Sequence, residues 1–332
     1  MRLIPGAHVL ARGDSALQVG LRDPLIVNDP TAHERRFLER LDAVATISAL
    51  ERARHAPMVE RLIAAGLVEQ DPSRETAEPR RAAINDGGPI GCGIGVVLSR
   101  AGWAVAIDDD GRAVETPRGT YDPGSLAATR QAAAADTIRR VLPHADVHAG
   151  PARSDVAIIV SHGAPLIEAA VPLMARDIPH LYVTTDERGA QVGPLVIPGR
   201  GACGTCVGLA RTLADPLWPT LSLQLAARRT LPLCSPDATA HAVALVAGAL
   251  GWWRSMRACA DGADGNGAVP DGAAPENAVG PTPQWLNTVW TVDHHRPPHA
   301  TKVLPHPDCG CGATGPVGDE LAARRARMHG AS

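Results

Sequence analysis

The stretch "AAINDGGPIGCGIGVVLSRAGWAVAIDDDG" (residues 82–111) decides the fold. Its apolar opening predicts a buried strand, which is followed by a glycine turn, a helix and a second strand that ends in acidic residues. This order is typical of the nucleotide-phosphate turn of a doubly wound fold, where backbone amides at the helix amino end favour an anion. The alternative is a structural turn that binds nothing.

Strands and helices continue to alternate beyond this stretch. Buried strands are predicted at "DVAIIVSHG" (Asp155–Gly163) and "PHLYVTT" (Pro179–Thr185). Helices are predicted at Leu126–Pro143, Ala164–Asp177, Leu221–Arg229 and Ala238–Met256. The pattern indicates an α/β fold with a Rossmann-like, mostly parallel sheet that is covered on both faces, spanning residues 82–260.

Residues 1–75 form a predicted module of their own. Three short strands are expected within residues 8–28, and helices are expected at Ala32–Asp42 and Met58–Gln70. Short strands beside short helices predict a winged-helix-like module. The polar residues 71–81 are interpreted as a linker.

The C-terminal part is more irregular. Residues 261–283 are rich in Gly, Pro and Ala and poor in bulky apolar side chains, which predicts a disordered loop. Residues 284–315 are predicted to form a strand (Trp285–Asp293) and a zinc knuckle, and residues 316–332 a tail. "DHHRPPH" (Asp293–His299) is interpreted as a solvated polar loop, with a metal ligand as the alternative.

Two close pairs of cysteines carry the strongest chemical signal. Cys203 and Cys206 have C-x-x-C spacing, and Cys309 and Cys311 follow about a hundred residues later. Four thiolates in two short knuckles can close a tetrahedral zinc site, which is structural because it leaves no position for water or substrate. A thioredoxin-like redox pair and unrelated free thiols are the alternatives.

Composition excludes several classes of function. The formal net charge of −3 gives no electrostatic reason for binding nucleic acid or an anionic membrane. The longest apolar run, Ala242–Trp253, is too short to cross a bilayer, and the start of the chain carries no secretory signal. A cytoplasmic protein is therefore expected, and in that compartment clustered cysteines more often bind metal than form disulfides.

The glycine turn, "GPLVIPGRGACGTC", "ADPLWP" and "HPDCGC" together resemble the ThiF/MoeB-type (ubiquitin-activating-like) adenylyltransferases. Within that superfamily they are most similar to actinobacterial cyclodehydratase and leader-peptide-binding proteins of azoline-peptide biosynthesis. The resemblance covers about residues 80–315, and the N-terminal module fits the peptide clamp of that group. It implies a homodimer, a structural zinc and, in active members, ATP and Mg²⁺ that convert a peptide carboxylate to an acyl-adenylate.

The resemblance also implies roles for individual residues. Gly88 and Gly91 match the second and third glycines of the phosphate turn, and Asp108 matches the ribose-binding acid. Arg130 lies about where the family has its phosphate-binding lysine. The residues that match the zinc ligands are Cys203, Cys206, Cys309 and Cys311.

The chain departs from the family at three places in the nucleotide site. Asp86 replaces the first glycine of the turn, and "ETPRGTY" (Glu115–Tyr121) replaces the Asn-x-x-Arg segment. Ser161 and His162 occur where a magnesium-binding Asp ends the strand. Because metal and cations neutralise the charge in phosphoryl chemistry, these changes should reduce catalysis more than they affect the fold.

The expected function is therefore that of a degenerate ThiF-like protein, which recognises a substrate or leader peptide and presents it to a partner enzyme. One alternative is an active ATP-dependent adenylyltransferase or cyclodehydratase, in which the candidate catalytic residues Arg130 and His162 have taken over the lost roles. A further alternative, of a different class, is an NAD(P)-dependent oxidoreductase.

Overall fold

The computed structural model describes the chain except residues 44–46, 70–79, 127, 229, 264–284 and 314–332. The chain divides into two compact units, Met1–Glu78 and Pro79–Ser332, and each is described by itself. The linker predicted at 71–81, the loop predicted at 261–283 and the tail predicted at 316–332 lie almost entirely outside the described residues.

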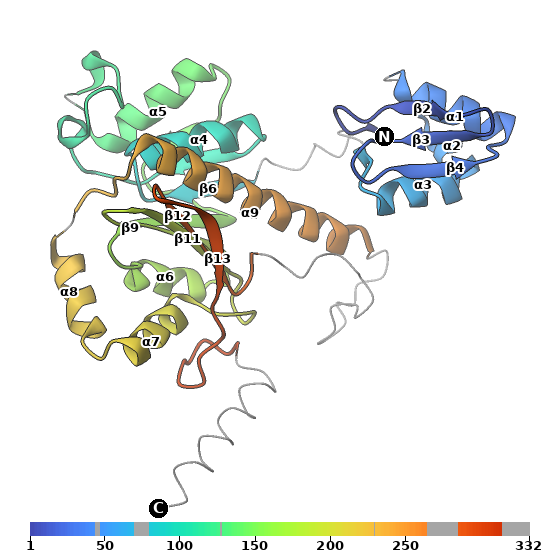
Figure 1. Ribbon diagram of the computed structural model, residues 1–332. Coiled ribbons are helices and arrows are strands. Elements are labelled where there is room, and N and C mark those ends of the chain that lie inside the picture. Colours follow the sequence, from blue (N-terminus) through green and yellow to red (C-terminus); the bar gives the residue numbers. More distant parts are fainter. Residues whose placement is uncertain (44–46, 70–79, 127, 229, 264–284, 314–332) are drawn as a thin grey trace, which may run out of the picture. The chain divides into compact units, whose positions relative to one another are not determined.

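The first unit packs a small antiparallel sheet on short helices (Figure 1). The strands are β2 (Val9–Arg12), β3 (Ala16–Val19) and β4 (Leu25–Asn28), with β3 in the middle. The helices are α1 (Ala32–Asp42), α2 (Ala49–Arg54) and α3 (Ala56–Ala64). Helices α1 and α2 each begin with a capping box, formed by Thr31 with Glu34 and by Ser48 with Glu51. The three predicted strands and the first predicted helix are thus present.

The predicted helix Met58–Gln70 is wrong in its second half. Helix α3 ends at Ala64, and Gly66 follows with a φ of 66°, a left-handed conformation that ends helices. The chain then forms β5 (Val68–Glu69), which pairs antiparallel with β1 (Arg2–Leu3). The winged-helix-like character of this unit stays a prediction.

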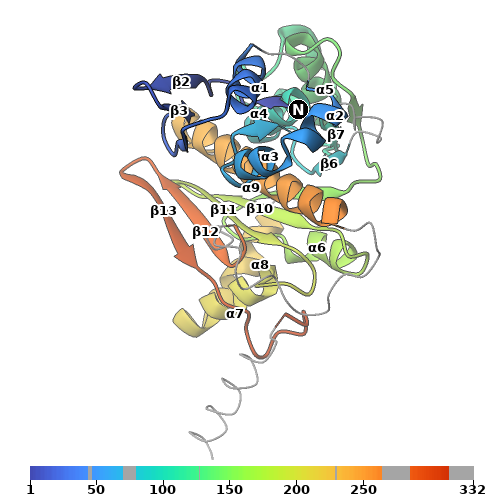
Figure 2. The same cartoon turned by 90° about the vertical axis from the view of Figure 1, so that its right-hand side faces the viewer.

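The second unit is built on one eight-stranded sheet with the order β13-β12-β11-β10-β9-β6-β7-β8 (Figure 2). The five strands from β10 to β8 run parallel, and the remaining three add on antiparallel. The parallel strands are β6 (Arg81–Ile84), β7 (Ala104–Ile107), β8 (Val147–Ala149), β9 (Val156–His162) and β10 (His180–Thr185). The antiparallel strands are β11 (Gly189–Val196), β12 (Thr288–Asp293) and β13 (Arg296–Lys302). The predicted α/β fold with a mostly parallel sheet is confirmed.

Helices cover both faces of this sheet, as Figure 1 shows. On one face lie α4 (Pro89–Arg100), α5 (Arg130–Val141) and α9 (Pro236–Ala263), which pack over the larger apolar core. On the other lie α6 (Ile167–Met174), α7 (Gly204–Ala214) and α8 (Trp218–Arg228). A smaller core under α6 and α7 includes Cys203, Cys206 and Cys309. The short 3-10 turns Ala113–Glu115 and Pro123–Ser125 lead into α5.

The polar loop predicted at Asp293–His299 is also wrong. The chain turns at His294 and His295 and returns as the edge strand β13, whose residues are all exposed. Strand β11 was not predicted, because Gly189, Gly193 and Pro194 obscure its alternation of apolar residues. Helix α7 was missed as well, although it begins within the C-x-x-C segment.

Of the helices in the described part of the chain, none combines the length and the apolar character needed to cross a bilayer.

Candidate functional site

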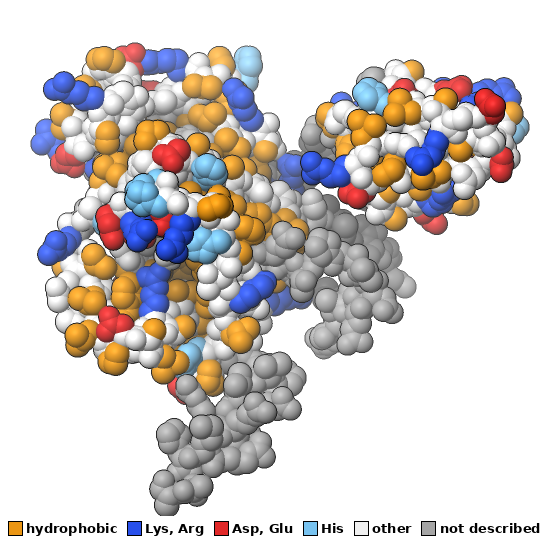
Figure 3. Space-filling view, viewed as in Figure 1, with side chains coloured by type: hydrophobic (Ala, Val, Ile, Leu, Met, Phe, Trp, Pro, Cys, Tyr) orange, Lys and Arg blue, Asp and Glu red, His pale blue; other side chains and the backbone are white. Residues whose placement is uncertain are grey.

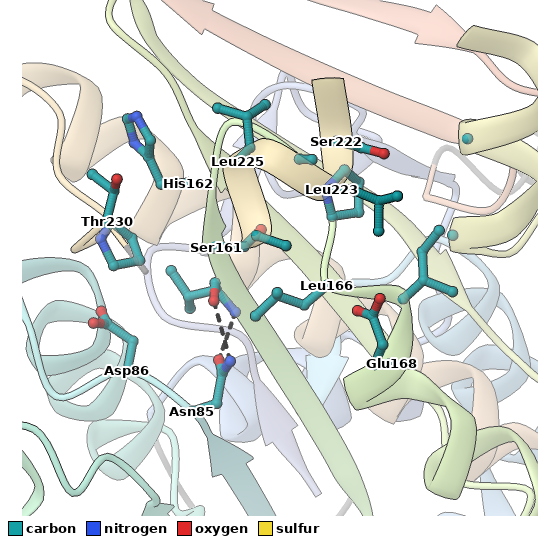
Figure 4. Close-up of a pocket in the computed structure, with 18 of the residues that line it drawn as sticks. Asn85, Asp86, Ser161, His162, Leu166, Glu168, Ser222, Leu223, Leu225 and Thr230 are labelled. Atoms are coloured by element: carbon teal, nitrogen blue, oxygen red, sulfur yellow. Dashed lines mark hydrogen bonds between the residues drawn. The ribbon is translucent and has the colours of Figure 1, made fainter. Parts of the chain in front are cut away.

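The glycine turn follows β6 and is tied to the neighbouring strand by Asn85. The Asn85 side chain donates from Nδ2 to the Val160 carbonyl (3.1 Å) and accepts at Oδ1 from the Val160 N–H (2.6 Å). These two bonds, drawn in Figure 4, hold the carboxyl ends of β6 and β9 together. Asp86 therefore lies at the carboxyl ends of the parallel strands, where open α/β proteins bind ligands.

The carboxylate of Asp86 occupies the amino end of α4. It is only 2% exposed, and its two oxygens accept the backbone N–H groups of Gly88 (3.0 Å) and Gly91 (2.8 Å). A Cβ on Gly91 would lie 1.8 Å from the Asp86 carbonyl oxygen, so only glycine permits this turn. Amides that can hold a phosphate in a glycine turn are here bonded to an anion of the chain itself.

Burial raises the pKa of Asp86 to about 6, and the hydrogen bonds from Gly88 and Gly91 oppose part of that rise. The native carboxyl therefore takes up its proton at a higher pH than the unfolded chain, so its contribution to stability should grow as pH falls from neutral.

We expect this to appear in the Asp86→Asn variant. Between pH 7.5 and 4.5, the free energy of unfolding of the wild type should gain about 2 kcal/mol relative to the variant. Urea denaturation of both proteins at the two pH values measures the difference. A difference that stays constant or changes in the opposite direction would contradict the raised pKa.

Arg130, at the first position of α5, already has two acidic partners. Its Nε bonds to Asp109 (2.8 Å) and its Nη1 pairs with Glu115 (3.2 Å). Asp109 also accepts the N–H of Gly87 (2.9 Å), so this ion pair packs directly on the glycine turn. A guanidinium held by two carboxylates has little positive charge left for a phosphate.

The structure places the predicted ribose acid, Asp108, in an exposed position just after β7. The next residue, Asp109, is the acid that contacts the turn. Three successive aspartates follow this strand, and spacing along the chain could not tell which of them points toward the turn.

A cavity of about 630 Å³ lies beside the turn (Figure 4). Its polar side is formed by Asn85, Asp86, Asp109, Asp110 and Arg130, and its apolar side includes Leu166, Leu223 and Leu225. At the end of β9, the Ser161 hydroxyl lies 3.3 Å from the Thr184 hydroxyl, and His162 Nδ1 lies 3.0 Å from Thr185 Oγ1. This strand end therefore offers a hydroxyl and an imidazole, and no carboxylate, to a metal ion.

The four predicted zinc ligands come together beside the amino end of α7. Cys203 Sγ lies 3.8 Å from Cys206 Sγ and 3.6 Å from Cys309 Sγ, and Cys206 Sγ lies 3.7 Å from Cys311 Sγ. All four sulfurs lie within 4.8 Å of one another, so they can hold a metal ion. Tetrahedral zinc with bonds of about 2.3 Å requires sulfurs about 3.8 Å apart, whereas a disulfide requires about 2.05 Å. The spacing fits zinc.

The fold positions these sulfurs through the start of α7. Cys203 is the N-cap and Cys206 lies in the first turn, while the N–H of His306 donates to Cys206 Sγ (3.3 Å). A Cβ on Gly204 would lie 2.4 Å from the Tyr182 hydroxyl, so glycine lets the helix start approach β10 closely. The cluster thus ties the segment after β13 to α7, about a hundred residues away in sequence.

Comparisons with known proteins agree with this fold. No family model and no curated protein matches the sequence. Among solved structures, E. coli MccB superimposes with a TM-score of 0.59 at 13% identity, covering 94% of this chain and 99% of MccB. MccB has also been solved with AMPCPP and MccA. The chain therefore has the ThiF/MoeB-like fold, which it shares with MccB.

Two heterocyclases are also similar. TruD gives a TM-score of 0.53 at 15% identity, covering 98% of this chain and 44% of TruD. A heterocyclase solved in complex with substrate and cofactor gives a TM-score of 0.55 at 14% identity, covering 94% of this chain and 39% of that protein. The chain thus spans less than half the length of each heterocyclase.

Proposed function

We propose that this chain is a degenerate ThiF-like peptide-recognition protein of modified ribosomal peptide biosynthesis, which presents a substrate or leader peptide to a partner enzyme. The observation that carries the proposal is the Asp86 carboxylate bonded to the amides of Gly88 and Gly91. The similarity in fold to MccB, solved with the MccA peptide, and to the heterocyclases supports a peptide as the ligand.

Charge at the glycine turn argues against a bound nucleotide. A phosphate would have to displace Asp86 from the helix amides or lie beside it, and a like-charge contact at 4 Å costs about 4 kcal/mol in a partly buried site. Arg130, the expected phosphate ligand, would have to give up Asp109 or Glu115. ATP and Mg²⁺ are therefore expected to bind weakly.

Pyrophosphate exchange tests this part of the proposal. The purified protein, incubated with ATP, Mg²⁺ and the precursor peptides encoded near its gene, should bind peptide without exchanging label between pyrophosphate and ATP. Peptide-dependent exchange would overturn the proposal that the chain recognises a peptide without adenylating it.

The edge of β4 is the place where we expect the peptide to bind. In the antiparallel pair of β3 and β4, successive residues of β4 direct their backbone N–H and C=O groups alternately toward β3 and away from it. Arg61 Nη2 of α3 donates to the Ile26 carbonyl from outside the sheet (3.0 Å). The backbone groups of Ile26 and Asn28 therefore point away from β3. On the opposite edge, the N–H of Val9 is already bonded to Asp42. An extended peptide can thus add as a fourth strand beside β4.

Proline substitution tests this edge. Ile26→Pro removes an N–H that faces away from the sheet, a position where proline is tolerated in edge strands, and should weaken binding of the precursor peptide at least tenfold. The matched control is Ala11→Pro on β2, whose N–H also faces outward but on the other edge. Fluorescence anisotropy with labelled precursor peptide measures both. Equal loss in the two variants, or loss only in Ala11→Pro, would contradict binding beside β4.

The second candidate function is an active ATP-dependent adenylyltransferase or cyclodehydratase. It is favoured by the 630 Å³ cavity, which Arg130 and His162 both line beside the glycine turn. In that case Asp86 and the Arg130 ion pairs would have to rearrange when ATP enters, and the exchange assay above would be positive.

A further inference from the structure

A second cavity, of about 560 Å³, lies between α7 and the β12–β13 hairpin. Its walls are mostly apolar and include Val207 and Val289. Leu213 and Leu304 line it while 63% and 64% exposed, so bulky apolar side chains stand uncovered at its rim. It shares no lining residue with the first cavity.

Arg211 brings a positive charge to this cavity. Its Nη2 donates to Gln191 Oε1 (2.7 Å), its guanidinium stacks on Trp218 at 4.6 Å, and it makes no ion pair within the described residues. Burial lowers the pKa of Arg211, and the opposing charge is that of Asp186. The Asp186 carboxylate is bonded to the amides of Arg188 and Gly189 instead. A half-buried cation without a bonded anion carries a desolvation cost, and a carboxylate ligand would offset it.

Two more hydrogen-bond donors line the same cavity. Lys302 Nζ donates to the neutral hydroxyl of Thr288 (3.0 Å). His306 is 8% exposed, and its Nδ1 accepts the N–H of Asp308 (3.2 Å), which places the proton of the neutral ring on Nε2. Nε2 is buried and has no partner among the residues that the structure describes. A buried donor of this kind calls for an acceptor.

We propose that this cavity is a docking site for a segment of a protein partner in which a carboxylate is flanked by apolar side chains. The carboxylate satisfies Arg211 and Lys302, and the flanking side chains cover Leu213 and Leu304. Figure 3 shows hydrophobic side chains with basic, acidic and histidine side chains among them on the face of the second unit that carries β13 and α7. The cavity belongs to the second unit and β4 to the first, and the proposal does not depend on the proposed function.

The single lysine of the chain gives a direct measurement. The probes are the peptides acetyl-Leu-Glu-Leu-Asp-Leu-amide and its uncharged match, acetyl-Leu-Gln-Leu-Asn-Leu-amide. The acidic peptide should protect Lys302 of the full chain from an amine-reactive reagent, as measured by mass spectrometry, and should bind at least tenfold more tightly than its match in calorimetry. Equal binding of the two peptides, or no binding, would overturn the proposal.

Variants locate the site. Arg211→Gln and Leu304→Ser should each weaken binding of the acidic peptide at least fivefold. Val114→Ser, at an exposed position outside the cavity, should leave that binding unchanged. Lys302→Glu should shift preference toward acetyl-Leu-Lys-Leu-Lys-Leu-amide, a gain that misfolding cannot produce. Binding should persist in Ile26→Pro; loss there would place the peptide on the first unit and overturn the proposal.

A second copy of the chain is the competing occupant. If light scattering shows a dimer that Leu304→Ser dissociates, and the acidic peptide neither binds nor competes with it, the face is an interface between copies and the peptide site is excluded.

Discussion

Cys309→Ser should release the metal and lower the melting temperature of the second unit by about 10 °C. The variant removes one of four thiolates whose sulfurs lie 3.6–3.8 Å from their neighbours, the spacing that tetrahedral zinc requires. Metal binding to a site that the unfolded chain lacks contributes directly to folding free energy. We expect the free energy of unfolding to fall by on the order of 4 kcal/mol. The fall is limited because the rest of this unit keeps its own apolar core.

Metal analysis and calorimetry of the purified chain measure both effects. The wild type should contain one zinc per chain, and the variant should contain little. Because the cluster ties the segment after β13 to α7, amide hydrogen exchange in Thr288–Lys302 should accelerate in the variant while that in β6 and β9 should not.

Cys234→Ser is the matched control. It makes the same chemical change at a half-buried cysteine whose sulfur contacts Thr239 and not the cluster. Zinc content should be unchanged there. If Cys309→Ser keeps a full equivalent of zinc and its melting temperature, the four-sulfur assignment is wrong.

Much of the fold could be predicted because its central strands are buried on both sides. β7 is a continuous apolar run and β6, β9 and β10 each contain one, and helices α4 and α6 have apolar residues at three- and four-residue steps. β11 and β13 could not be predicted in this way. β11 contains Gly189, Gly193 and Pro194, and β13 is an exposed edge strand that begins "RPPH", a sequence with no apolar alternation. Their pairing depends on tertiary contacts with β10 and β12.

The candidate sites divide in the same way. The cysteines could be predicted as a cluster because two close pairs of thiols at this spacing are typical of a metal site. The sequence also placed the Asp86 charge near the phosphate turn, but not its bonds to Gly88 and Gly91, which depend on the path of the backbone. The partners of Arg130, and the meeting of Arg211, Lys302 and His306 at one cavity, join segments far apart in the chain, and no local pattern reveals them.

Asp86→Gly should tighten ATP binding at least tenfold without producing turnover. The substitution frees the amides of Gly88 and Gly91 and removes a negative charge at the amino end of α4, where a phosphate is favoured. Without ATP, the variant should be less stable by about 1–2 kcal/mol, because two buried amides lose their acceptor. Saturating ATP should recover that loss, so the melting temperature of the variant should depend on ATP more steeply than that of the wild type.

The matched control is Asp110→Gly, which removes the same charge from an exposed residue that lines the cavity. If general charge repulsion is what weakens ATP binding, both variants should bind ATP more tightly than the wild type. If the bonds of Asp86 to the Gly88 and Gly91 amides are the cause, only Asp86→Gly should bind ATP more tightly. We expect the second result in calorimetry. Mg²⁺ should add little in either variant, because Ser161 and His162 end β9 where a metal-binding carboxylate would be needed, and pyrophosphate exchange should stay absent. Micromolar, magnesium-dependent ATP binding by the unmodified chain would contradict this account and favour the adenylyltransferase.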